Sequence, residues 1–267
     1  MNPLTHSRFS VQWLKEQGFR TNENLVILGS ILPDLSYMGF IPEREAHMEG
    51  VAFMNFLQKK DPSYAPLGIG FMLHGEKPYC LDYFTHRPEG YIAQKSAVIR
   101  EALVRARFKL KYWYSQKEED FVHSLIEFSG DTLMESDSGK KVHQAFLSVD
   151  LERVARHLAT FFNSDTKMIL RALHFFRKFN FQRLQHTKGV VHSIQDFSIL
   201  KAFSQKNNTM ERYGAIMNRL NPWRTHKLVK VLDSVQEIVA EDYHEFLAKT
   251  QEKIKKHAVR QVAQVVV

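Results

Sequence analysis

The sequence is short of the residues on which several classes of protein depend. Its 267 residues include one cysteine, Cys80, which excludes an internal disulfide framework and is typical of a reducing compartment. Twelve glycines and eight prolines are too few for a sheet-rich fold with many tight turns. No run of eighteen apolar residues is present, and the N-terminal segment carries charges where a secretory signal has an apolar stretch. We therefore expect a cytoplasmic protein without a transmembrane segment.

Positive charge is in excess. The chain has 37 Lys and Arg against 29 Asp and Glu, a formal net charge of +8. Such a balance favours anionic partners, among them phosphate esters, nucleic acid and an acidic membrane surface. The alternative interpretation is that Lys and Arg only cover solvated helix faces. Binding to nucleic acid is not favoured, because we find neither an aromatic platform nor a recognised binding motif.

Most of the chain has helical periodicity. Apolar residues recur at steps of three and four in the segments 100–114, 151–162, 166–179 and 226–264. Asp165 and Thr166 are typical of a helix start, whereas Gly130 and Gly189 are predicted to interrupt helices. No alternating segment is long enough to predict a sheet. The sequence therefore predicts an all-α fold, a multi-helix bundle with additional C-terminal helices.

The histidines of the two halves have different neighbours. In the first half they lie beside glycine, proline or short helices. In the second half His157, His174, His244 and His257 lie in amphipathic helices among charged residues, where we expect ordinary surface or core-edge roles. We predict that residues 1–135 form the functional half. Residues 136–267 are predicted to form a helical half that packs on it within one continuous domain.

The segment "LHGEKPYCLDYFTH", residues 73–86, contains two histidines and an aspartate among aromatic residues. Proline is tolerated in the first turn of a helix, so we predict a helix that begins near Pro78. Asp82 and His86 would then lie four residues apart on one face of that helix. His74 lies just before the break and could fold over the helix start.

A second pair, His123 and Glu127, is four residues apart in the apolar segment "FVHSLIEF". Burying such a pair costs free energy unless its members are paired or bind a metal, and imidazole with carboxylate suits zinc. The alternative is an ordinary surface pair. Upstream, Asp34 follows an apolar run and a proline, where it could be only a turn residue. His6 and His47 are unremarkable when taken singly.

The order of these motifs resembles the zinc-dependent phospholipase C family, which includes phospholipase C/D-like proteins and, more distantly, single-strand-specific zinc nucleases. The motifs are Thr-His near the start, Pro-Asp, a histidine, Leu-His, Leu-Asp, Thr-His and His-x-x-x-Glu, and they span residues 4–131. The resemblance implies a helical bundle of that family's type with up to three zinc ions in one cleft.

The resemblance also implies which residues bind the metals. One zinc ion would be held by Asp34, His47, His74 and Asp82. A second would be held by His86, His123 and Glu127. A third would depend on His6, with Asp82 shared as a bridging ligand. We therefore expect two zinc ions, and a third only if His6 takes part. The set of five imidazoles and three carboxylates is one that zinc accepts.

The spacing departs from the family pattern in two places. Family members place a histidine four residues before the aspartate, but here Pro78 occupies that position and His74 is eight residues before Asp82. An insertion from Gly75 to Pro78 explains this difference, and so does the loss of a ligand. In addition, the His-x-x-x-Glu pair follows His86 by 37 positions, farther than in the secreted enzymes.

The predicted function is that of a zinc-dependent hydrolase of the phosphodiesterase or phospholipase C type, which cleaves a phospholipid or another phosphodiester through a zinc-activated water. Asp34 would orient that water, Asp82 would bridge two metals, and Arg87 is a positional guess for holding the anion. The alternative is a non-catalytic helical protein of the same fold that binds a membrane surface or a protein partner. An HD-type phosphohydrolase and a zincin are excluded, because the chain has neither His-Asp nor His-Glu-x-x-His.

Overall fold

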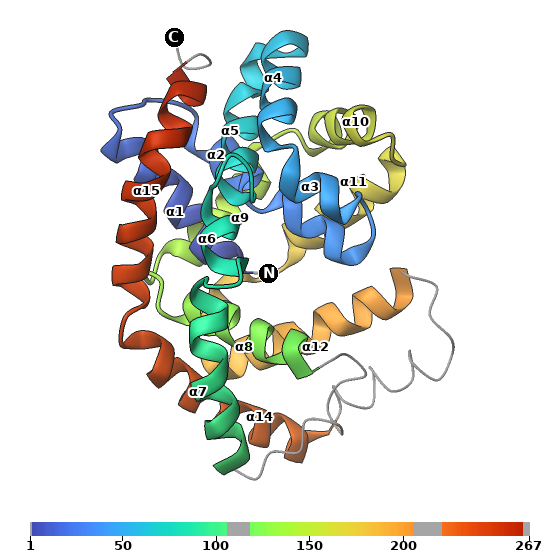
Figure 1. The fold of residues 1–267 in the computed structure, drawn as a ribbon. Coiled ribbons are helices and arrows are strands. Elements are labelled where there is room, and N and C mark those ends of the chain that lie inside the picture. Colours follow the sequence, from blue (N-terminus) through green and yellow to red (C-terminus); the bar gives the residue numbers. More distant parts are fainter. Residues whose placement is uncertain (1, 106–117, 205–220, 264–267) are drawn as a thin grey trace.

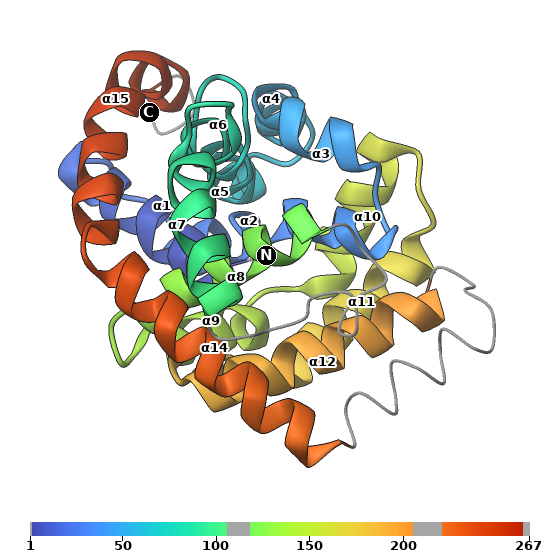
Figure 2. The same ribbon diagram turned by 60° about the horizontal axis from the view of Figure 1, so that its bottom comes forward.

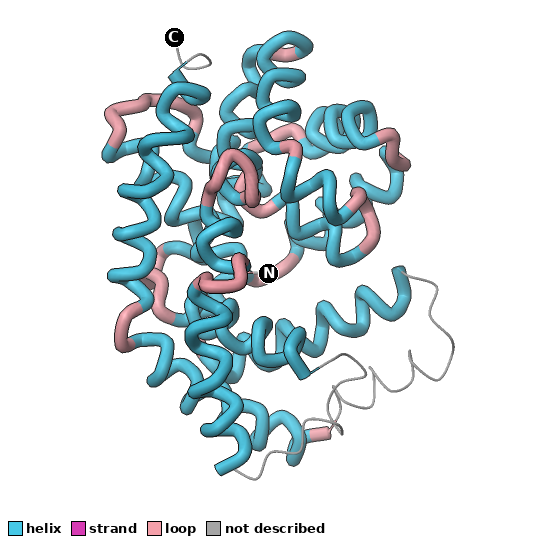
Figure 3. The backbone as a smooth tube through the Cα atoms, in the orientation of Figure 1, coloured by secondary structure: helices cyan, strands magenta, loops and turns pink. Residues whose placement is uncertain are grey.

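The computed structural model describes residues 2–105, 118–204 and 221–263 of the chain. Over these ranges the backbone forms helices joined by loops and contains no β-strand (Figure 3). The prediction of an all-α fold is confirmed. None of the helices in these ranges is long and apolar enough to cross a membrane.

The first part of the chain forms mainly short helices. They are α1 (Pro3–Glu16), α2 (Glu23–Gly29), the 3-10 helix η1 (Leu32–Met38), α3 (Glu43–Met48), α4 (Gly50–Lys60), the 3-10 helix η2 (Pro62–Tyr64), α5 (Ala65–His74), α6 (Leu81–His86), α7 (Tyr91–Arg105) and α8 (Glu118–Thr132). The α5 segment is apolar all round, and every residue of it except Pro66 is buried. A helix without a polar face belongs in the interior, and α5 lies there between α2 and α4.

The second part contains the longest and the most strongly amphipathic helices of the described residues. Its helices are α9 (Ser138–Ser148), α10 (Leu151–Phe162), α11 (Thr166–Lys178), the 3-10 helix η4 (Phe181–Gln185), α12 (Thr187–Ser204), α14 (Pro222–Ala240) and α15 (Tyr243–Ala263). The longest are α12, α14 and α15, and the most strongly amphipathic are α10 and α11. Several helices of this part begin with a capping side chain, as in α11, where Asp165 accepts hydrogen bonds from the backbone of Lys167 and Met168. The predicted start at Asp165 and Thr166 is confirmed.

The periodic segment 226–264 covers two helices, since α14 ends at Ala240 and α15 begins at Tyr243. Two predicted helix interruptions are wrong, because Gly130 and Gly189 lie inside α8 and α12. A Cβ on Gly130 would lie 2.4 Å from the ring of Tyr243, and one on Gly189 would lie 2.0 Å from the carbonyl oxygen of Arg183. Both glycines therefore permit close packing. Residues 106–114 of the predicted helix 100–114 lie outside the described residues.

One hydrophobic cluster extends through both parts of the chain, from Leu4 to Val262. Among the second-part helices, α9 packs on α1 and α2, and α14 packs on α7 and α8. The last helix, α15, runs along one side of the molecule beside α1 and α6 in both views (Figures 1 and 2). The C-terminal helices thus pack against the same elements that carry the predicted site residues.

Candidate metal centre

The structure brings all eight predicted site residues together, although they come from six elements. These are His6 on α1, Asp34 on η1, His47 on α3, His74 on α5, Asp82 and His86 on α6, and His123 and Glu127 on α8. A continuous series of imidazole–carboxylate contacts joins them. His6 and Glu127 meet here although 121 positions separate them in the sequence.

Asp82 lies at the middle of the cluster. Its Oδ1 is 3.4 Å from Nε2 of His6, and its Oδ2 is 3.1 Å from Nε2 of His74. The same Oδ2 lies 3.5 Å from Nε2 of His47 and 4.0 Å from Nδ1 of His86. Four imidazoles therefore face one carboxylate, and three of them come from other helices. The i, i+4 relation of Asp82 and His86 on α6 agrees with the sequence prediction.

Glu127 forms the second focus. Its Oε1 lies 3.1 Å from Nε2 of His123, one turn earlier on α8, and 3.2 Å from Nε2 of His86. His86 therefore faces Glu127 with one ring nitrogen and Asp82 with the other, which links the two foci. Asp34 joins the first focus through His74, whose Nε2 is 4.0 Å from Asp34 Oδ1.

Close helix packing sets the position of His74. A Cβ on Gly29 would lie 2.0 Å from the carbonyl oxygen of Leu67, and one on Gly70 would lie 2.1 Å from that of Val26. Only glycine permits this approach of α2 to α5. As a result, the carbonyl oxygen of Ser30, just past the end of α2, lies 2.7 Å from Nδ1 of His74.

These backbone contacts also determine which nitrogen carries the proton in two imidazole rings. A carbonyl oxygen only accepts, so Nδ1 of His74 donates to Ser30, and Nδ1 of His47 donates at 2.9 Å to the carbonyl of Glu43. In the neutral ring the lone pair is then on Nε2, the nitrogen that faces Asp82. Metal-ligating histidines are oriented by the same kind of partner.

The loop between His74 and Asp82 differs from the prediction. The helix α6 begins at Leu81, not near Pro78, and residues 75–80 form a turn with a cis Lys77–Pro78 peptide bond. The backbone N–H of Glu76 donates at 2.8 Å to the carbonyl of His47, and a Cβ on Gly75 would lie 2.7 Å from that oxygen. Gly75 and Glu76 thus pack on α3, and His74 lies 3.1 Å from Asp82.

Several buried polar atoms of the cluster make no hydrogen bond to any residue that the structure describes. They are His6 Nδ1, Asp34 Oδ2, His47 Nε2 and Asp82 Oδ2. Asp82 Oδ2 lacks a well-aligned bond although three imidazole nitrogens lie within 4.0 Å of it. Leaving such atoms unpaired costs free energy, which a bound cation removes.

The geometry provides three places for a cation. Each consists of three ligand atoms that lie within 4.8 Å of one another: His6, His74 and Asp82; Asp34, His47 and His74; and His86, His123 and Glu127. Buried imidazole and carboxylate groups are thus arranged so that they can hold metal ions.

The charges of the cluster depend strongly on one another. Burial raises the pKa of Asp34 and, together with the charge of His74, lowers that of His6. For His86, burial acts to lower the pKa, but Asp82 and Glu127 outweigh it and raise the pKa to about 9. Burial likewise acts to raise the pKa of Asp82, but His74 and His86 hold it well below its usual value. The carboxylates therefore need positive charge beside them.

The cluster is buried on one side and accessible on the other. The side chains of Asp34, His74 and Asp82 are at most 3% exposed, whereas those of His86 and His123 are 18% and 30% exposed. His86 and His123 are therefore the members of the cluster with the most exposed side chains.

Sequence reasoning missed two residues of this site. Asp131, one turn after Glu127, accepts hydrogen bonds from the backbone N–H groups of Thr5 at 2.8 Å and Leu4 at 3.3 Å. It thereby anchors the first turn of α1, which carries His6. Tyr37 packs edge-on against the His47 ring at 5.9 Å, and burial together with the nearby carboxylates raises its pKa. The only sequence signals were their short distances from Glu127 and Asp34.

Arg87, which we expected to hold the anion because of its position, directly follows His86 at the end of α6. Its guanidinium lies over the rings of Tyr83 and Phe84, at 5.7 and 5.3 Å from their centres. These aromatic contacts involve residues of α6 that are not among the eight site residues. The Nε of Arg87 is buried and makes no hydrogen bond to a described residue, and the role of Arg87 in holding an anion stays a prediction.

A second cluster contains His157, one of the predicted bystanders. Asp61, between α4 and η2, accepts two hydrogen bonds from the guanidinium of Arg153, at 2.6 and 2.7 Å. It also accepts from Nε2 of His157 at 2.7 Å and from the hydroxyl of Ser63 at 2.8 Å. We call these four residues the Asp61 cluster. His157 thus has a structural partner and lies apart from the eight site residues.

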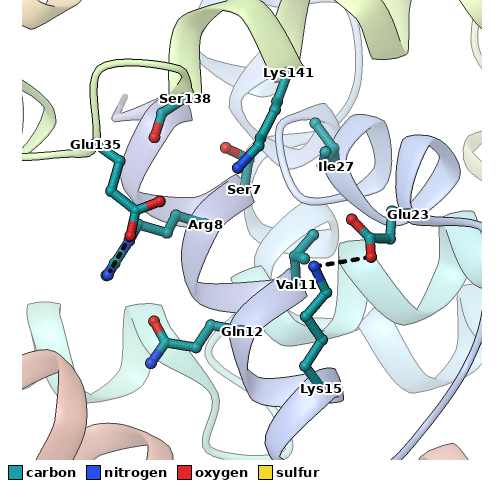
Figure 4. Close-up of a pocket in the computed structure, with 10 residues that line it drawn as sticks. All are labelled: Ser7, Arg8, Val11, Gln12, Lys15, Glu23, Ile27, Glu135, Ser138 and Lys141. Atoms are coloured by element: carbon teal, nitrogen blue, oxygen red, sulfur yellow. Dashed lines mark hydrogen bonds and ion pairs between the residues drawn. The ribbon is translucent and has the colours of Figure 1, made fainter.

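Another hollow, of about 290 Å³, lies on the face of α1 opposite to His6 (Figure 4). Its cations already have carboxylate partners: Arg8 pairs with Glu135 at 3.0 Å, and Lys15 pairs with Glu23 at 2.9 Å. Lys141 pairs with Asp137 at 2.8 Å. Paired charges of this kind are typical of a solvated surface and not of an anion site.

Comparison of the chain with models of known protein families, with curated proteins and with solved structures finds no match in any of the three.

Proposed function

We propose that the protein is a metal-dependent hydrolase of the zinc-dependent phospholipase C type that cleaves a phosphodiester, either a phospholipid or a soluble one. The observation that carries the proposal is the meeting of five imidazoles and three carboxylates, several with buried atoms that lack a hydrogen bond. The order of the motifs along the sequence supports the same family.

The spacing of the ligand atoms suits zinc. Two ligands about 2.0–2.2 Å from a tetrahedral zinc ion lie about 3.3–3.6 Å apart. Asp82 lies 3.4 Å from His6 and 3.5 Å from His47, and Glu127 lies 3.1 Å from His123. Small movements on binding bring these separations into the range of a shared ion. Zinc in such a set supplies hydroxide from water near neutral pH and neutralises phosphoryl oxygens.

Individual residues of the chain would take the remaining roles in metal binding, proton transfer and substrate entry. Asp82, which faces four imidazoles, would be shared between two metal ions. Asp34 Oδ2 is buried and makes no hydrogen bond to a described residue, so it is available to accept a proton from water and orient it. Burial raises the pKa of Asp34, which makes it a stronger base. The phosphodiester enters past His86 and His123, the two accessible members, and the net charge of +8 favours an anionic substrate.

The test combines metal analysis with an activity assay. We expect two or three zinc equivalents in the purified protein. We also expect hydrolysis of a chromogenic phosphodiester or a phospholipid that stops with chelator and returns with zinc. A protein that binds no metal would overturn the proposal. A fully loaded protein that is inactive on every phosphoester would instead support the non-catalytic alternative, a helical binding protein of the same fold.

A further inference from the structure

A straight row of cations runs along one face of α15. Lys249, Lys253, Lys256 and Arg260 follow one another at steps of four, three and four residues, so they share one face of the helix. All four are exposed. Lys249 pairs with Glu245, but among the described residues no ion pair is found for Lys253, Lys256 or Arg260. We call these four residues the α15 stripe.

Aromatic rings from the segment before and within α6 lie beside the α15 stripe. A groove of about 550 Å³ lies between Tyr79, Tyr83 and Phe84 on one side and Lys253, Lys256 and His257 on the other. The ammonium of Lys253 lies 5.5 Å above the ring of Phe84, and the ring of Tyr79 packs edge-on against that of His257 at 5.2 Å. The groove contains one carboxylate, Glu252.

Tyr79 is unusual in two respects. Its φ angle is +72°, a left-handed conformation that costs free energy for a bulky residue. Its side chain is nevertheless 44% exposed, and its ring packs edge-on against that of Tyr83 at 4.6 Å. This backbone holds an aromatic side chain at the surface beside Lys253 and Lys256, for which no ion pair is found among the described residues.

We propose that the α15 stripe and the rings of Tyr79 and Tyr83 bind the headgroups of anionic phospholipids at a bilayer surface. Lysine and arginine near such a surface contribute about 1 kcal/mol each, and tyrosine favours the headgroup level because its ring is apolar and its hydroxyl polar. The row is straight, which fits a flat anionic surface. No helix in the described ranges could anchor the chain by spanning the bilayer.

A single-stranded nucleic acid is the rival occupant, because cations and aromatic rings also bind it. Bases stack on free ring faces. Here the ring of Phe84 already has Lys253 over it, and the ring of Tyr83 has Arg87 over it. These rings are therefore less suited to stack bases than to support the cations. The membrane inference does not depend on hydrolysis, although α6 carries Tyr83 together with Asp82 and would hold the metal centre near the bilayer.

The test is sedimentation of the purified protein with vesicles of phosphatidylcholine, with and without phosphatidylserine, which gives the bilayer a negative surface potential. We expect binding only to the anionic vesicles, and weaker binding at high salt. The double variant Lys253→Glu/Lys256→Glu should bind at least about thirtyfold more weakly. Tyr79→Ala should also weaken binding. The metal-loaded protein is used, and the amount of intact lipid recovered in the pellet separates binding from any hydrolysis.

The matched control is Lys230→Glu/Lys255→Glu, which changes the net charge equally. Lys255 lies on α15 but about 160° around the helix from Lys253, and Lys230 lies on α14. This variant should bind like the wild type, and both doubles should keep the wild-type circular dichroism. Equal losses in both doubles, or equal binding to zwitterionic vesicles, would overturn the inference. So would tighter binding to a single-stranded oligonucleotide that Lys253→Glu/Lys256→Glu abolishes, or competition by soluble glycerophosphate at low millimolar concentration, which indicates a site for free phosphate.

Discussion

The candidate metal centre and the Asp61 cluster both combine histidine with carboxylate groups, yet they differ in the partners of their carboxylates. In the Asp61 cluster one carboxylate receives hydrogen bonds from a guanidinium, an imidazole and a hydroxyl. In the metal centre the ion pairs that Asp34 and Asp82 make with described residues are all to histidines. One cluster contains a permanent cation, and the other contains only cations that titrate.

That difference separates a cluster with a structural role from a cluster that can hold a metal ion. Arg153 remains charged at every pH at which the protein folds, so Asp61 needs nothing further. Although burial acts to raise its pKa, the hydrogen bonds from Arg153, Ser63 and His157 hold it below its usual value. Asp82 is buried among imidazoles, and these would be neutral when they bind a metal ion. The charge of the metal ion would then take the place of the histidine charges that face this buried carboxylate.

The largest expected effect is that of Asp82→Asn, which keeps the size of the side chain and removes its charge. Because the carboxylate faces four imidazoles, its loss should cost several kcal/mol of metal binding and transition-state stabilisation, about a thousandfold in the rate of phosphodiester hydrolysis. Zinc analysis should show at least one equivalent lost. A variant that matches a chelator-sensitive wild type would show that Asp82 is not a bridge.

The same change in the Asp61 cluster should affect stability alone. Asp61→Asn removes charge-assisted hydrogen bonds and should lower the free energy of unfolding at pH 7 by about 2 kcal/mol. Zinc content and hydrolysis should be unchanged, which makes this variant the matched control for Asp82→Asn. Urea unfolding measures the effect, and a loss of metal would contradict the separation of the two clusters.

The contribution of Asp61 should also depend on pH in a defined direction. Its pKa is lower in the folded protein than the ordinary value of 3.8, so the folded state holds the proton less tightly than the unfolded state. The stabilisation is therefore complete above the ordinary pKa and is lost as the pH falls through the folded one. The difference in unfolding free energy between wild type and Asp61→Asn should be constant from pH 7 to pH 5 and shrink toward pH 3.

The smallest effect is expected for His244→Ala. His244 is exposed on α15 and is not one of the eight site residues. Zinc content should stay the same, and the free energy of unfolding should change by less than about 0.5 kcal/mol. Loss of a full zinc equivalent would show that sequence position does not separate ligands from bystanders in this chain.

The sequence was sufficient to predict the all-α fold and the residues that meet in the centre. Apolar periodicity identified α10 and α11 closely, because both have a polar face and a capping side chain. The i, i+4 pairs on α6 and α8 were readable for the same reason, since helix geometry fixes which side chains share a face.

Other features depended on contacts that local sequence does not encode. Gly130 reads as a break, but its lack of a side chain accommodates the ring of Tyr243 from a helix more than a hundred positions away. The start of α6 at Leu81 follows from how residues 75–80 pack on the carbonyl of His47. Nothing in the local sequence distinguishes Asp131 from other acidic residues, because its role depends on hydrogen bonds from the first turn of α1.

The meeting of six separate elements at one centre has a consequence for the stability of the folded chain and its resistance to proteolysis. A metal ion held there would act as a cross-link between segments as far apart as His6 and Glu127, since the unfolded chain cannot offer those ligands together. Each tenfold rise in the free concentration of that metal above its dissociation constant would add about 1.4 kcal/mol to the free energy of unfolding. The supply of metal would therefore set how long each copy of the protein survives proteolysis.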